Sequence, residues 1–83
     1  MNKNNKNKYD EFPDKNFDNE NFCYEVIFNG PVEQHGKAYY FLAKIYRQQE
    51  HYNKAEDNLF KAIEFGYNRQ LCFDDIDAIY AEI

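Results

Sequence analysis

Apolar residues recur at spacings of three and four along three stretches of the chain after Glu33, which places them on one face of an α-helix of about 3.6 residues per turn. The recurring residues are Ala38, Tyr39, Leu42, Ala43, Ile45 and Tyr46, then Ala55, Leu59, Ala62 and Ile63, then Phe73, Ile76, Ile79, Tyr80 and Ile83. The pattern predicts helices over residues 35–49, 53–65 and 71–82. No sheet is expected.

Residues with known preferences for helix ends lie at the predicted boundaries. Asn53 is expected to cap the second of these helices through its side-chain oxygen. Gly66 follows that helix, where a residue able to adopt positive φ ends a helix without strain. Asp74 and Asp75 are expected in the first turn of the last helix, where negative charge suits the helix dipole.

The segment before Gly30 fits two structures by periodicity alone. Its aromatic and β-branched residues alternate as in a strand, yet Cys23, Val26 and Ile27 also fit a helix closed by Gly30. An internal repeat favours the helix, because Cys23 to Gly30 aligns with Leu59 to Gly66, apolar on apolar. We therefore expect a first helix over residues 18–29.

The same repeat continues in the helices that follow, where Tyr39, Leu42 and Tyr46 recur as Phe73, Ile76 and Tyr80. The period is about 34 residues, the length of a tetratricopeptide repeat. The residues also resemble that family, whose first helix carries a pattern like Tyr39, Leu42, Ala43 and Tyr46, and whose second helix carries one like Ala55, Leu59 and Ala62. The related Sel1-like repeats share much of this pattern, so both families stay open.

The resemblance implies an all-α fold, a short right-handed stack of antiparallel helical hairpins with one full repeat flanked by two half repeats. This domain is expected over residues 18–83. Residues 1–17 are rich in Asn, Lys and Asp and lack a periodic apolar face, so we interpret them as a flexible polar tail. Asp77 stands where the second repeat should have a small residue, so the last helix is expected to be a cap or an assembly edge.

Composition narrows the class of function. The 83 residues carry a formal net charge of -5, which argues against direct binding to nucleic acid. No apolar run follows the first lysines as in a secretory signal, and none approaches the roughly 20 residues of a membrane span. Cys23 and Cys72 lie in apolar-patterned segments and are expected to be buried thiols of a cytoplasmic protein.

Little in the sequence predicts catalysis. The chain has no Ser, no Thr and no Gly-rich phosphate loop, and His35 and His51 are interpreted as solvated loop residues. Neither Cys has a second ligand at metal-binding spacing. We therefore expect a protein that is not an enzyme and that holds neither a metal nor another cofactor.

The leading hypothesis is a protein-interaction module, an adaptor or regulator. The resemblance implies that the first helix of each hairpin lines a concave groove, where a basic and aromatic stripe would bind an acidic peptide or a terminal carboxylate of another protein. The stripe consists of Lys37, Tyr40, Lys44, Arg47 and Gln48. A second copy or a foreign partner is also expected to cover the outer face of the last helix.

The alternative hypothesis is a small acidic inhibitor that imitates nucleic acid in the basic channel of a larger enzyme, as an immunity or anti-defence protein would. Its binding surface would be a set of acidic residues near the start of the chain. These are Asp10, Glu11, Asp14, Asp18, Glu20 and Glu25.

Overall fold

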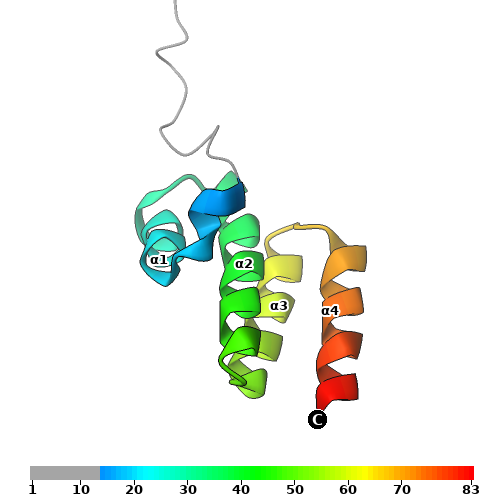
Figure 1. Ribbon diagram of the computed structural model, residues 1–83. Helices are drawn as coiled ribbons and strands as arrows, with labels where there is room; N and C mark the ends of the chain where they lie inside the picture. Colours follow the sequence, from blue (N-terminus) through cyan, green and yellow to red (C-terminus); the bar gives the residue numbers. More distant parts are fainter. Residues whose placement is uncertain (1–13) are drawn as a thin grey trace, which may run out of the picture.

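The computed structural model describes residues 14–83, which form helices joined by short turns (Figure 1). A short 3-10 helix, η2 (Asp14–Asp18), leads into α1 (Glu20–Asn29), and a second one, η3 (Val32–Gln34), leads into α2 (His35–Gln48). The helices α3 (Tyr52–Glu64) and α4 (Arg69–Glu82) follow. The described residues form no strand, so the four predicted helices are confirmed and the strand interpretation of the segment before Gly30 is wrong.

The helix ends differ from the prediction in detail. Asn19 caps α1 by accepting a hydrogen bond from the Phe22 backbone N–H at 3.2 Å. Asn68 caps α4 in the same way, so α4 begins two residues earlier than predicted and Asp74 and Asp75 fall beyond its first turn. Their expected place in the first turn is therefore wrong.

The turn between α2 and α3 also corrects a predicted cap. Glu50 adopts a left-handed φ of 63°, and the His51 N–H donates to the Tyr46 carbonyl at 2.9 Å, which turns the chain early enough for α3 to begin at Tyr52. Asn53 therefore lies inside the first turn of α3 and is not its cap. Gly66 has the predicted positive φ, 84°, and ends α3.

Helix α2 lies at the centre of the molecule, with α1 on one side and α3 packed along the other (Figure 1). Four alanines at these contacts, Ala38, Ala43, Ala55 and Ala62, are at most 2% exposed. Their small side chains let the helix axes approach closely, and Leu42 and Leu59 fill the remaining space. Ala43, Ala55 and Ala62, which the apolar periodicity of the sequence includes, therefore lie in the helix contacts.

The interpretation of residues 1–17 as a solvated tail is wrong for its last residues. Phe17 is fully buried, and its ring contacts Phe22 edge-to-face at 5.0 Å and Phe41 at 5.6 Å between centroids. Because this ring sits under η2, the segment from Asp14 onward belongs to the folded domain. The predicted tail residues before it lie outside the described part of the chain.

The internal repeat has a partial counterpart in burial. Two aligned pairs are buried in both copies, as the repeat requires: Cys23 with Leu59, and Val26 with Ala62. Tyr46 is buried, whereas its repeat partner Tyr80 is 58% exposed and its hydroxyl donates a hydrogen bond to Glu56 of α3. Helix α4 packs on α3, and the described residues place no further helix beyond it. Stacking in the manner of a tetratricopeptide array stays a prediction.

No helix among residues 14–83 combines the length and the apolar character needed to cross a bilayer.

Candidate functional site

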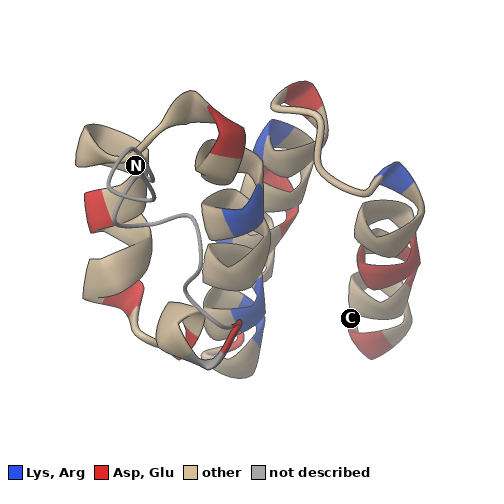
Figure 2. Ribbon diagram, turned by 90° about the horizontal axis from the view of Figure 1, so that it is seen from above, with Lys and Arg blue, Asp and Glu red and all other residues tan. Residues whose placement is uncertain are grey.

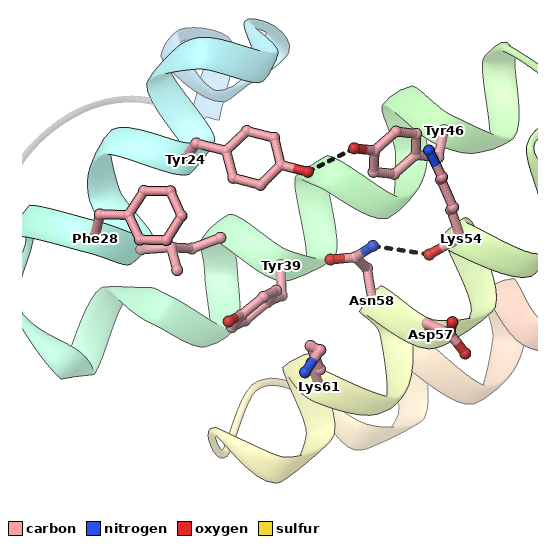
Figure 3. A pocket seen from close by; sticks show the side chains of 9 residues that line it. Tyr24, Phe28, Tyr39, Tyr46, Lys54, Asp57, Asn58 and Lys61 are labelled. Carbon is pink, nitrogen blue, oxygen red and sulfur yellow. Dashed lines mark hydrogen bonds between the residues drawn. The ribbon is translucent and has the colours of Figure 1, made fainter.

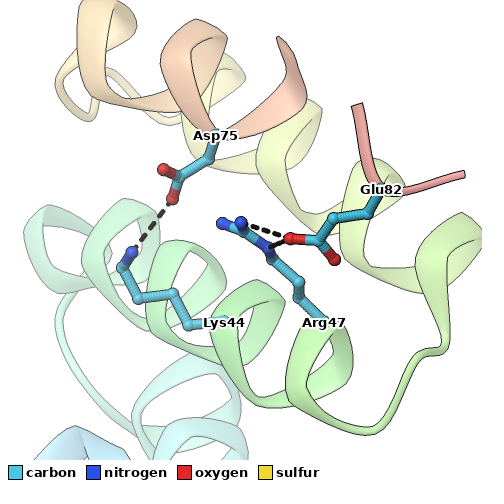
Figure 4. A network of polar contacts seen from close by, with 4 residues as sticks. All are labelled: Lys44, Arg47, Asp75 and Glu82. Atoms are coloured by element: carbon cyan, nitrogen blue, oxygen red, sulfur yellow. Dashed lines mark hydrogen bonds and ion pairs between the residues drawn. The ribbon is translucent and has the colours of Figure 1, made fainter. Parts of the chain in front are cut away.

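The predicted basic stripe on α2 is neutralised by carboxylates of the same molecule. Lys44 Nζ lies 3.1 Å from Asp75 Oδ2, and Arg47 forms two hydrogen bonds to Glu82 Oε2, the Nε one at 2.8 Å (Figure 4). These contacts cross from α2 to α4. Lys37 forms an ion pair with Asp14 at 2.7 Å and lies over the ring of Phe17.

Tyr40 is not the exposed contact residue that was predicted. Its side chain is 6% exposed, its ring stacks on Tyr67 with centroids 4.8 Å apart, and the Lys44 ammonium stands 4.8 Å from its centroid. Burial raises the pKa of the Tyr40 hydroxyl. Burial alone would lower the pKa of Lys44, but hydrogen bonds to Asp75 and Tyr40 outweigh it, and the pKa rises.

Of the stripe, Gln48 alone is both exposed and without an ion pair in the described region. A pocket of about 320 Å³ does lie here, lined by Lys44, Arg47, Gln48 and Glu82. An acidic ligand entering this pocket would have to displace Glu82 or Asp75, because their carboxylates already form ion pairs with Arg47 and Lys44. The structure brings the predicted residues together but leaves them little unpaired charge.

The residues of the alternative acidic surface are divided among different contacts. Asp10 and Glu11 lie outside the described residues. Asp14 pairs with Lys37, Asp18 is exposed at the end of η2, and Glu20 accepts a hydrogen bond from the Tyr46 hydroxyl at 3.2 Å. Glu25 is exposed on α1. Two of the described members, Asp14 and Glu20, are thus engaged in contacts within the molecule, and a binding role for the set stays a prediction.

A different groove, of about 390 Å³, opens between α1, α2 and α3 (Figure 3). We call it the aromatic groove. The α1 wall is apolar, the floor is aromatic and comes from α2, and the α3 wall is polar. The lining residues are Tyr24, Ile27 and Phe28 from α1, Tyr39 and Tyr46 from α2, and Lys54, Asp57, Asn58 and Lys61 from α3.

Hydrogen bonds and ring contacts hold the walls of the aromatic groove in place. The hydroxyls of Tyr24 and Tyr46 lie 2.5 Å apart, and Tyr46 donates onward to Glu20. The Tyr24 and Phe28 rings stack with centroids 6.0 Å apart, although Phe28 remains 75% exposed. Tyr39 stacks on Phe65 at 5.5 Å. Rigid aromatic side chains of this kind lose little entropy when a ligand binds.

Two lysines stand over these rings on the α3 side. Lys54 Nζ is 5.5 Å from the centroid of Tyr46, and Lys61 Nζ is 5.8 Å from that of Tyr39. Within residues 14–83 neither lysine forms an ion pair. A solvent-exposed cation over an aromatic ring gains about 0.5–1 kcal/mol, so these ammonium groups keep a preferred place beside the groove while staying open to a carboxylate.

The nucleophilic and imidazole side chains lie elsewhere. Cys23 and Cys72 are free and buried, as predicted, and burial together with Glu20 and Asp18 raises the pKa of Cys23 to about 12. Both thiols are therefore protonated at neutral pH.

His35 is not the solvated loop residue that was expected, since its Nε2–H donates to the Gly30 carbonyl at 3.1 Å and its ring packs on Phe65. In the described part of the chain, no three His, Cys, Asp or Glu residues gather as metal ligands.

Sequence analysis did not identify the aromatic groove. Tyr39 was counted among the apolar residues of its helix face, and Lys54 and Lys61 were given no binding role. The available signal was the pair Tyr24 and Phe28, four residues apart on one face of α1, and the two lysines, seven apart on α3. Only the packing of α1 and α3 against α2 shows that these pairs face each other.

Comparison with known proteins adds no relative. No protein-family model matches the chain, and no curated protein or solved structure shows significant similarity to it.

Proposed function

We propose that this protein is a non-catalytic protein-binding module that takes a segment of a partner protein into the aromatic groove. The exposed ring of Phe28 carries the proposal. The ring is 75% exposed and lies beside the preformed aromatic floor of the groove. A partner that covers a large apolar ring removes it from water, which lowers the free energy of the complex. Aromatic side chains in such a position commonly dominate the energy of protein interfaces.

The groove on α2 that the sequence predicted is the less favourable site. Its cations would have to exchange Asp75 and Glu82 for a ligand carboxylate, so a new ion pair would replace an existing one with little net gain. The aromatic groove needs no such exchange, because its lysines and the Phe28 ring are uncovered.

The test compares two exposed phenylalanines by affinity capture from the native cell, with circular dichroism confirming helix content. Phe28→Ala removes a groove ring, and Phe60→Ala removes an equally large ring, 45% exposed, that does not line the groove. We expect a partner that wild type and Phe60→Ala retain and that Phe28→Ala loses by tenfold or more, because truncating an interface anchor typically costs about 2 kcal/mol. Capture that is independent of Phe28 contradicts the proposal.

A further inference from the structure

The distribution of charge around the aromatic groove differs from that of the rest of the molecule. The chain as a whole is acidic, and α1 and α4 on either side carry mostly carboxylates, whereas α2 carries three cations and no carboxylate, and α3 carries Lys54 and Lys61 together with Glu56, Asp57 and Glu64 (Figure 2). The cations of α2 are all bound by carboxylates of η2 or α4. Lys54 and Lys61 are not, and both line the groove.

The distance between these two lysines indicates how far apart the carboxylates of the ligand should lie. They are seven residues apart on α3, which corresponds to about 10 Å along the helix. Asp57 and Asn58 lie between them, so the middle of this wall is not positive and the favourable places for carboxylates are at its two ends. Residues three apart in an extended segment also span about 10 Å.

The opposite wall sets the second requirement. Tyr24, Ile27 and Phe28 bring no charge to the groove, so they favour an aromatic or aliphatic side chain of the ligand. Together the walls call for an apolar anchor flanked by negative charge. A basic ligand would meet Lys54 and Lys61 with like charge.

Building on the proposed function, we infer that the partner segment is acidic, with an aromatic or aliphatic anchor on Phe28 and Tyr24 and carboxylates beside Lys54 and Lys61. The charge complementarity comes from Lys54 and Lys61, which line the groove and form no ion pair within residues 14–83. Since the contacts are at the surface, their contribution falls at high salt.

Selection from a random library of displayed dodecapeptides tests the inference. Wild-type protein is the bait, and Lys54→Glu/Lys61→Glu is the second bait. We expect wild type to enrich peptides with acidic residues around an aromatic or aliphatic anchor, and the reversed protein to enrich basic peptides with the same kind of anchor. Arg69→Glu, which reverses an exposed cation outside the groove, should enrich the same peptides as wild type.

The affinities of the enriched peptides for each variant measure how much the two lysines contribute to binding. Lys54→Gln/Lys61→Gln should bind acidic peptides about 2- to 30-fold more weakly, as expected for two exposed ion pairs, and Lys54→Arg/Lys61→Arg should retain binding. Circular dichroism verifies that each variant stays helical.

The outcomes separate the two claims. Enriched peptides that depend on Phe28 but are neutral or basic, or are insensitive to charge reversal, overturn the acidic partner and leave the groove as the binding site. Enriched peptides that bind Phe28→Ala as well as wild type, or no enrichment at all, overturn the groove itself.

Discussion

Single side chains tie together parts of this molecule that lie far apart in sequence. Phe17 joins η2 to α1 and α2 through its ring, and Lys37 covers that ring with its ammonium 4.9 Å from the centroid. Phe28, also a phenylalanine in the N-terminal part, lines the aromatic groove instead and is 75% exposed. The same residue type therefore serves stability at one position and surface recognition at the other.

The two rings should differ sharply in their effect on stability. Phe17→Ala empties a fully buried site and should lower the free energy of unfolding by about 3–5 kcal/mol, whereas Phe28→Ala should change it by less than about 0.5 kcal/mol. Urea unfolding followed by circular dichroism measures both. Equal effects of the two substitutions would show that Phe17 does not anchor η2 in solution.

The Tyr46 hydroxyl makes stability depend on alkaline pH. Its hydrogen bond with Tyr24 and its burial raise its pKa above the ordinary value of 10.0, so the folded state favours the neutral phenol. This contribution is complete below pH 10 and is lost as the pH rises from there toward the folded-state pKa.

Absorbance at 295 nm, which follows phenolate formation, tests this dependence together with the midpoint of urea unfolding. We expect the midpoint to fall above pH 10 and to fall less steeply in Tyr46→Phe, which should also cost about 1 kcal/mol at neutral pH through the lost hydrogen bonds. An identical pH profile for the variant would argue against the raised pKa.

At the scale of elements, the two glycines of the α2–α3 hairpin have different reasons to be glycine. Gly66 has φ of 84° and open space around it, so its backbone conformation is the constraint. Gly36 has ordinary helical geometry, but a Cβ there would lie 3.0 Å from the Tyr67 Cβ and 3.3 Å from the Ala62 carbonyl oxygen. Close approach of α2 to the end of α3 is its constraint.

Two substitutions at each glycine distinguish these reasons. Gly66→Ala should cost about 1–2 kcal/mol through left-handed strain, and Gly66→Asn should recover part of that, since Asn tolerates the conformation. Gly36→Ala should cost about 1–3 kcal/mol through overpacking, and Gly36→Asn should cost more. Thermal and urea unfolding give the comparison, and a recovery by Asn at both positions would be inconsistent with it.

At the scale of the whole molecule, charge links the central helix to its neighbours. The described side chains of α2 include three cations and no carboxylate, and their partners come from η2 and α4. Helix α4 packs on α3 and is joined to α2 through Asp75 and Glu82. It is the element most dependent on these polar contacts.

Acid should therefore loosen α4 first. The hydrogen bond from Arg47 lowers the pKa of Glu82, so its stabilising contribution is present above the ordinary value of 4.5 and is lost as the pH falls through the lower folded-state pKa. Amide exchange, expressed as protection factors at pH 6 and pH 3, should show a larger loss in α4 than in α3. In Glu82→Gln this difference should shrink, and uniform loss across both helices would contradict the expectation.

The outer face of α4 bears on assembly. Phe73 and Tyr80 of α4 are 42% and 58% exposed, and the Tyr80 hydroxyl donates a hydrogen bond to Glu56 of α3. That a second copy or a foreign partner covers this face stays a prediction from the sequence, and sedimentation at micromolar concentration is the measurement for it.

The sequence by itself determined where the helices lie. Spacings of three and four are local and predicted the three helices after Glu33, the internal repeat predicted the first helix, and Gly66 correctly marked the end of α3. Caps were less predictable, because the turn at Glu50 and His51 moved the start of α3 ahead of Asn53. Local chemistry therefore specified elements better than their ends.

The tertiary structure decided which charged side chains are paired within the molecule and which can bind a partner. Helical spacing correctly put Lys44 and Arg47 on one stripe, but their carboxylate partners lie 31 and 35 residues further along the chain, and their pairing depends on how α4 packs. The aromatic groove likewise joins residues of α1 and α3 that no periodicity relates. Side-chain pairing across helices depends on how the loops set the helices against each other, and this is the information that a one-dimensional pattern lacks.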